Sequence, residues 1–149
     1  MLTLQEISDR LEIHDMLHRY SELIDTKDFQ ALRTDVFTAD AHIDYSAFGG
    51  SVGNVDETVA FLEEAMTDAT FPNTQHLNAN HQIRLDGDRA TGKIMCLNPQ
   101  NLRIGEETRV FFLGLWYLDE YRRTDAGWRI ARREEEKSWA HNTPSFMKL

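Results

Sequence analysis

The spacing of apolar residues changes at Pro72, and this change constrains the fold more than any other feature of the chain. Before Pro72 apolar residues recur at helical spacing, whereas after it they alternate at every second residue, as in β-strands. Helices followed by an antiparallel meander are typical of the α+β class, with the helices packed on one face of a curved sheet. The 149 residues suffice for one such domain, which we expect to span residues 1–149.

Two helices in the first half are preceded by capping-box signatures, in which Thr or Asn is followed three residues later by Glu. Thr3 and Glu6 begin a helix that continues to about Ile24, and Asn54 and Glu57 begin a second. The other elements expected in this half are a short helix over residues 29–36, a strand over 41–46 and a glycine-rich loop over 49–53.

The second half contains four expected strands joined by tight turns. The longest, Thr108–Arg123, is apolar on both faces, although the outer face of a sheet covered on one side is usually polar. An exposed apolar patch of that size usually marks an interface, so we expect a homo-oligomer that packs sheet faces together. The four strands are expected over residues 74–85, 89–97, 108–123 and 128–135.

Composition excludes several classes of function. The net charge of −9 disfavours binding to nucleic acids and to anionic membrane surfaces. No apolar run approaches the roughly 20 residues that span a bilayer, and the N-terminus lacks the features of a signal peptide, so we expect a cytoplasmic protein. Cys96 is the one cysteine, which rules out an intrachain disulfide and a cysteine-based zinc site.

Several charged and polar clusters have ordinary structural interpretations. His14 and His18 lie one helical turn apart without an evident third ligand, so we expect a solvated helix face rather than a metal site. His42 and His141 have no local partner and are expected to be structural or exposed. The run Glu134–Glu136, beside Arg132 and Arg133, is interpreted as a solvated strand edge.

Asp25 is a stronger candidate for a functional residue. It lies at the C-terminal end of the first helix, where the helix dipole disfavours a carboxylate, and its flanking residues Ile24 and Phe29 suggest partial burial. A buried carboxylate needs a partner. Asp25 is therefore either a turn residue or the partner of a histidine from the sheet, which would fix the tautomer of the imidazole. The pattern alone leaves both interpretations open.

Three short segments stand out along the chain: DTKD at Asp25–Asp28, IDY at Ile43–Tyr45 and TQH at Thr74–His76. In this order and at similar spacing, they resemble scytalone dehydratase and the wider nuclear-transport-factor-2-like superfamily. That superfamily includes polyketide cyclases, ketosteroid isomerase and hexachlorocyclohexane dehydrochlorinase. The resemblance covers nearly the whole chain. It implies a cone formed by helices and a strongly curved, mostly antiparallel sheet with one internal pocket, and a trimeric assembly.

The resemblance also implies roles for individual residues. At matching positions, Asp25 orients His76, His76 removes a proton, and Tyr45 helps to polarise a substrate carbonyl. The implied function is a cofactor-independent, dehydratase-like lyase that acts next to a carbonyl of a small apolar ring substrate, with no metal. An isomerase, a cyclase, a dehydrochlorinase and a non-catalytic small-molecule binder remain as alternatives.

The chain also departs from the scytalone dehydratase pattern. A second tyrosine is replaced by Ile24, a second histidine by Gln100, and an asparagine of the long strand by Tyr117, so scytalone itself is not the expected substrate. Strict alternation places Asn78 beside His76 on the inner face and His81 on the opposite face, as an interface or structural residue. The expected substrate contacts are Tyr117, Gln100, Asn78, Asn98 and Phe48, and the other expected apolar pocket residues are Phe61, Leu62, Phe111, Leu113 and Leu115.

Overall fold

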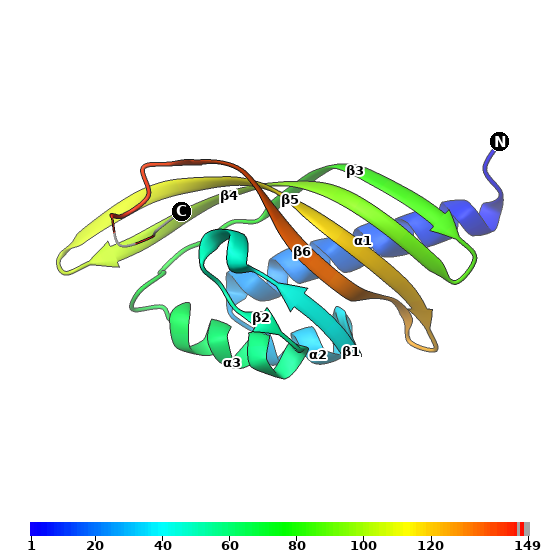
Figure 1. The fold of residues 1–149 in the computed structure, drawn as a ribbon, viewed down its shortest axis with the longest axis horizontal. Coiled ribbons are helices and arrows are strands. Elements are labelled where there is room, and N and C mark those ends of the chain that lie inside the picture. The colour runs from blue at the N-terminus through cyan, green and yellow to red at the C-terminus, as the bar shows by residue number, and fades with distance from the viewer. Residues whose placement is uncertain (146, 148–149) are drawn as a thin grey trace.

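The computed structural model describes residues 1–145 and residue 147. Figure 1 shows the helices on the concave side of a long, strongly bent sheet. Within these residues, no helix combines the length and the apolar character needed to cross a membrane. The helical elements are α1 (Leu4–Thr26), a 3-10 turn (Phe29–Ala31), α2 (Leu32–Asp35), a second 3-10 turn (Ser46–Phe48) and α3 (Val55–Ala65). The strands are β1 (Phe37–Asp44), β2 (Val52–Gly53), β3 (Leu77–Asp86), β4 (Arg89–Ile104), β5 (Glu107–Thr124) and β6 (Gly127–His141).

The six strands form one mixed sheet in the order β2-β1-β6-β5-β4-β3. Strands β3 to β6 form an antiparallel meander, and β1 pairs in parallel with β6. The predicted α+β class, with helices packed on a strongly curved and mostly antiparallel sheet, is confirmed. Strands β4 and β6 continue to Ile104 and His141, beyond the predicted ends near residues 97 and 135.

Both predicted capping boxes are present. The side chains of Thr3 and Asn54 accept hydrogen bonds from the backbone amides of Glu6 and Glu57, and each glutamate bonds back to the cap residue. Helix α1 ends at Thr26, and its C-cap residue Lys27 adopts a left-handed conformation with φ of 62°. The helix predicted over residues 29–36 is a 3-10 turn followed by a single helical turn.

The hydrophobic core lies between the helices and the concave face of the sheet. On β5, Phe111, Leu113, Leu115 and Tyr117 point into this core and are almost completely buried. The opposite face of β5 remains apolar and partly exposed, and Val110 retains 46% of its accessible surface. The two-faced apolar character of this strand is therefore present in the structure, and its use as an interface stays a prediction.

A β-bulge in β3 changes which residues face α1. The register shifts between Ala79 and Gln82, and Asn80 has a positive φ of 47°. After the bulge His81 points towards α1, where its ring lies 4.4 Å from that of His14 between centroids. The prediction that His81 lies on the face opposite His76 is wrong because strict alternation does not allow for a bulge. Across the described residues, no group of three or more His, Cys, Asp or Glu side chains is placed to hold a metal ion.

Candidate active site

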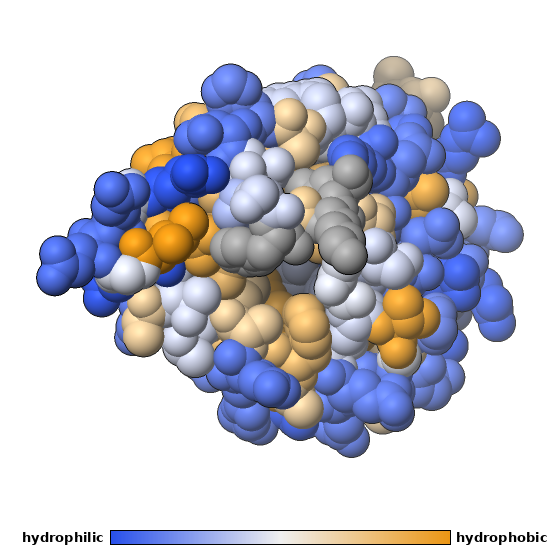
Figure 2. Space-filling model, turned by 60° about the vertical axis from the view of Figure 1, so that its left-hand side comes forward, coloured by the Kyte–Doolittle hydropathy of each residue, from blue (hydrophilic) through white to orange (hydrophobic). Residues whose placement is uncertain are grey.

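A pocket with a cavity volume of about 160 Å³, partly open to solvent, lies between α1, α3 and the concave face of the sheet. Figure 2 shows a hollow in one face of the molecule, bordered by apolar side chains. Six of the eight predicted site residues line the pocket: His76, Tyr45, Tyr117, Gln100, Asn98 and Phe48. Asp25 lies behind His76 and contacts it directly.

Asp25 holds His76 by two separate contacts. Its Oδ1 lies 2.7 Å from Nδ1 of the imidazole, and its Oδ2 accepts the backbone N–H of His76 at 3.0 Å. The hydroxyl of Thr74 donates a third hydrogen bond to Oδ1 at 2.8 Å. Of the two interpretations that the sequence left open, the structure shows pairing with a histidine, His76, which directly precedes β3.

This pairing defines the chemistry of the imidazole. Burial acts to raise the pKa of Asp25, but the hydrogen bonds and charge interaction with His76 and the hydroxyl of Thr74 outweigh it, and the net shift is downward. Asp25 is therefore a carboxylate near neutral pH and accepts the Nδ1–H proton. In that tautomer Nε2 carries the lone pair, and the His76 side chain, 8% exposed, lies at the pocket wall.

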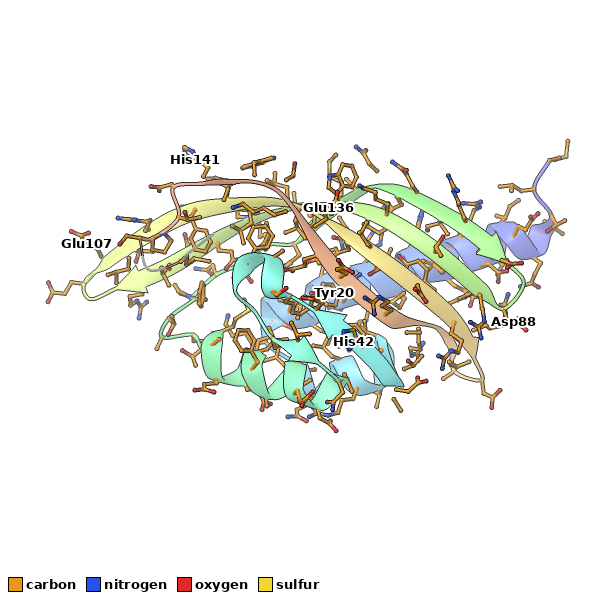
Figure 3. The ribbon with its side chains drawn as sticks, viewed as in Figure 1. Tyr20, His42, Asp88, Glu107, Glu136 and His141 are labelled. Atoms are coloured by element: carbon orange, nitrogen blue, oxygen red, sulfur yellow. The ribbon has the colours of Figure 1, made fainter. Side chains whose placement is uncertain are left out.

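Three tyrosines line the pocket beside His76. The hydroxyl groups of Tyr20 and Tyr45 lie 2.9 Å apart, and the rings of Tyr20 and Tyr117 meet edge to face with centroids 5.7 Å apart. Burial raises the pKa of all three, so they remain protonated and can donate hydrogen bonds. Tyr20 was not among the predicted site residues; it lies on α1 and points into the interior (Figure 3). Its position one helical turn before Ile24 was the available signal.

The remaining pocket wall combines two amides with an apolar surface. Asn98 is 2% exposed, donates from Nδ2 to the carbonyl of Gln75 at 2.8 Å and accepts a hydrogen bond from Gln100. Phe111 does not line the pocket, because it is completely buried behind it against Phe71. The apolar residues that were predicted and do line it are Phe48, Phe61, Leu62, Leu113 and Leu115.

Asn78 does not line the pocket, in contrast to the predicted substrate contact. Its Nδ2 donates to the hydroxyl of Ser21 at 2.9 Å and to the carbonyl of Leu17 at 3.3 Å. Both acceptors belong to α1, which packs against β3 at this point. Asn78 therefore links β3 to α1 through hydrogen bonds.

The interpretation of residues 132–136 as a solvated edge is wrong for Arg133 and Glu135. Arg133 is completely buried, forms a bidentate ion pair with Asp119, and lies 4.0 Å from the ring centroid of Tyr117. Glu135 lines the pocket. Because residues two apart on a strand share a face, both point inward, whereas Glu136 is exposed and bonds to Lys93. The spacing of Arg133 and Glu135 indicated that they share a face of the strand. Because their neighbours are also charged, the whole stretch was interpreted as solvated.

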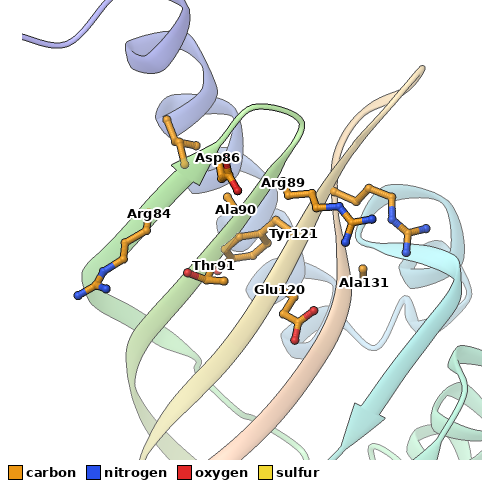
Figure 4. Close-up of a pocket in the computed structure, with 10 residues that line it drawn as sticks. Arg84, Asp86, Arg89, Ala90, Thr91, Glu120, Tyr121 and Ala131 are labelled. Atoms are coloured by element: carbon orange, nitrogen blue, oxygen red, sulfur yellow. The ribbon is translucent and has the colours of Figure 1, made fainter.

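A second hollow lies elsewhere on the sheet, as Figure 4 shows. Its wall includes Arg84, Asp86, Glu120 and Arg122, together with Tyr121, whose hydroxyl donates to Asp119 at 2.9 Å. It shares no lining residue with the pocket that contains His76. His76 and the candidate hydrogen-bond donors around it line the first pocket instead: Tyr20, Tyr45, Tyr117, Asn98 and Gln100.

The chain belongs to the SnoaL-like domain family, whose profile matches residues 5–134. It is 44% identical over 137 residues to uncharacterized proteins of Mycobacterium tuberculosis and Mycobacterium bovis. That match covers 92% of this chain and 90% of each relative. The relatives therefore share nearly the whole length of the chain.

Solved structures with the same fold include a protein of Kribbella flavida, with a TM-score of 0.80, 26% identity and coverage of 91% of this chain and 94% of that one. A candidate scytalone dehydratase from Novosphingobium aromaticivorans has a TM-score of 0.79 at 22% identity, covering 93% and 89% of the two chains. A hexachlorocyclohexane dehydrochlorinase from Novosphingobium barchaimii has a TM-score of 0.75 at 18% identity, covering 95% and 98%. These three structures share the fold of the chain.

Proposed function

We propose that this protein is a cofactor-independent lyase of the dehydratase type, in which His76 removes a proton next to a carbonyl of a small ring substrate. The observation that carries the proposal is the Asp25–His76 pair at the wall of an apolar pocket. Two proteins of the same fold are named for removing water and for removing hydrogen chloride, and both reactions are eliminations.

The proposed reaction uses side chains of this chain alone. Nε2 of His76 takes the proton, and the carboxylate of Asp25 stabilises the imidazolium that forms. Tyr45 and Tyr117 donate hydrogen bonds to the oxygen that gains charge as the enolate develops. A positioned base contributes about 10²–10⁴-fold to the rate, and oxyanion stabilisation adds to this. Departure of the leaving group from the adjacent carbon completes the elimination.

The pocket favours a small apolar ring as the substrate. Five of its lining residues are Phe or Leu that the sequence predicted, and its polar groups gather around His76, the tyrosines and the amides. An isomerase, a cyclase or a dehydrochlorinase could use the same base, and would differ in the step after proton removal. A non-catalytic binding protein would need the pocket but has no need of an aspartate that holds a histidine.

The outer face of the sheet supports a second proposal, that copies of the chain associate through it. Val110 and Trp139 are each 46% exposed there, and Phe112, Trp116 and Leu118 are partly exposed. We propose a homo-oligomer, a trimer by resemblance. Light scattering on wild type and on a Val110→Lys variant tests this. A trimeric mass that Val110→Lys lowers supports the proposal, and a monomeric wild type contradicts it.

The catalytic proposal is tested by screening cyclic hydroxy-ketones and halogenated rings with wild type, His76→Ala and a control, His42→Ala. His42 is exposed and lies outside the pocket. We expect turnover by wild type and by His42→Ala, and loss of about 10²–10⁴-fold in His76→Ala, with the fold retained in circular dichroism. Equal rates in wild type and His76→Ala would remove His76 from the mechanism.

A further inference from the structure

Glu135 is a partly buried carboxyl group in the same pocket as His76, and the proposed proton abstraction does not use it. In the register of the sheet it lies directly opposite Tyr117 on β5, which also lines the pocket. Arg133, two residues earlier on the same face, directs Nε and Nη2 to Asp119. Among the described residues, the guanidinium of Arg133 forms an ion pair with Asp119 and none with Glu135, and its Nη1 has no hydrogen-bond partner.

Glu135 holds a proton near neutral pH. Burial raises its pKa to about 8; the attraction of Arg133 opposes this shift, and the repulsion of Asp44 adds to it. A protonated carboxyl group in an apolar pocket is a proton donor. The titratable or charged groups near it are Arg133 on its own strand, Asp44 and Tyr45 at the end of β1, Tyr20 on α1, Tyr117 on β5 and Cys96 on β4.

We propose that Glu135 is the catalytic acid that protonates the departing oxygen, and that the substrate is accordingly a ring ketone with a hydroxyl group on the β-carbon. This inference rests on the proposed function, because it requires that His76 remove the α-proton. Hydroxide is a poor leaving group, but the oxygen departs readily as water once it is protonated. A halide leaves as an anion and needs no proton. A cation would stabilise a departing halide better than a protonated carboxyl group does.

The step balances without an external oxidant or reductant. The electron pair of the α-C–H bond forms the new C=C bond, and its proton goes to Nε2 of His76. The C–O bond breaks with its electron pair on oxygen, and that oxygen takes the proton of Glu135 and leaves as water. The products are an unsaturated ring ketone and water. His76 then releases its proton to solvent and Glu135 regains one, which restores the starting state.

The test uses the variant Glu135→Gln, which keeps the size and polarity of the side chain but cannot supply a proton. The probes are 3-hydroxycyclohexanone, which needs an acid, and 3-acetoxycyclohexanone, whose acetate leaves without one. We expect turnover of the hydroxy ring to fall by about 10²–10⁴-fold in Glu135→Gln while the acetoxy ring is little affected. Glu136→Gln is the matched control and should change neither rate. Glu136 is the exposed neighbour of Glu135 (Figure 3) and accepts a hydrogen bond from Lys93.

The protonation state of Glu135 provides a second test, which does not depend on turnover. Infrared difference spectra between wild type and Glu135→Gln at pH 7 should contain the band of a protonated carboxyl group. A carboxylate band in its place, or equal losses on both rings, would overturn the role of Glu135 while leaving His76 as the base. If wild type turns over neither ring, the proposed function fails and the role of Glu135 falls with it. If His76→Ala loses both activities and Glu135→Gln loses neither, only the role of Glu135 is overturned.

Discussion

Arg133 and Asp119 form a bidentate ion pair beneath the pocket, with Nε–Oδ1 and Nη2–Oδ2 distances of 2.8 and 2.7 Å and both side chains fully buried. Removal of one partner leaves a buried, unpaired charge. We therefore expect Asp119→Ala to cost about 3–5 kcal/mol of the free energy of unfolding, measured by urea denaturation.

The exposed pair of Asp40 and Arg122 provides the control for this measurement, because both of its side chains are largely accessible to solvent. Asp40→Ala should change the free energy of unfolding little, because an exposed ion pair is screened by solvent. Similar losses of unfolding free energy in Asp40→Ala and Asp119→Ala would contradict the expected effect of burial on the Arg133–Asp119 pair.

The tautomer of His76 is the basis of a second prediction. Asp25→Asn removes the charge that stabilises the imidazolium and allows an amide N–H to face Nδ1, so turnover should fall by about 10²–10⁴-fold with little loss of stability. Steady-state kinetics on whichever ring ketone wild type converts is the measurement. Asp28→Asn, in an exposed position three residues later, should retain wild-type rates. Full activity in Asp25→Asn would contradict the proposed role of the pair.

Glu135 makes the stability of the protein dependent on pH in a defined direction. Its pKa is raised from 4.5 to about 8 by burial, so between these values the folded chain keeps a proton that the unfolded chain releases. The contribution of Glu135 to stability is present below pH 4.5 and is lost as pH rises towards 8. In thermal melts, Glu135→Gln should gain stability relative to wild type across this interval, and the gain should level off above it. A pH-independent difference would argue against a buried acid.

Two glycines of the sheet should differ in their tolerance of a methyl group. A Cβ at Gly92 would lie 2.5 Å from the hydroxyl of Tyr121, a buried ring that Asp119 holds in place. Gly92→Ala should therefore cost about 1–3 kcal/mol. A Cβ at Gly114 would overlap the indole of Trp139, which is 46% exposed and has room to turn away, so its cost should be smaller. Urea denaturation measures the free energy of unfolding lost in each variant. A greater loss in Gly114→Ala than in Gly92→Ala would contradict the prediction.

The fold could be predicted largely from local signals. The capping boxes at Thr3 and Asn54 fixed where two helices begin, and the change to alternating apolar residues indicated the meander. Parallel pairing of β1 with β6 lay outside this prediction, because alternation within a strand does not specify its neighbour. The long β4 includes Pro99 within Asn98–Asn101, a stretch whose composition resembles a loop.

The site could be predicted in part. The resemblance carried by three short motifs implied that Asp25, Tyr45 and His76 share one site. The bulge at Asn80 turned His81 towards α1, and no residue-by-residue alternation allows for such an insertion. Glu135 was missed because the charges around it give its stretch of β6 the composition of a solvated strand.

The central claim is that His76, held by Asp25, abstracts a proton next to a carbonyl. The most direct test is to monitor by NMR the exchange of the α-protons of cyclohexanone in D₂O. Cyclohexanone has no leaving group, so exchange reports proton removal alone. The proposed mechanism predicts that wild type accelerates exchange, that Asp25→Asn does so weakly, and that His76→Ala leaves only the buffer rate. Equal acceleration by wild type and His76→Ala would contradict it.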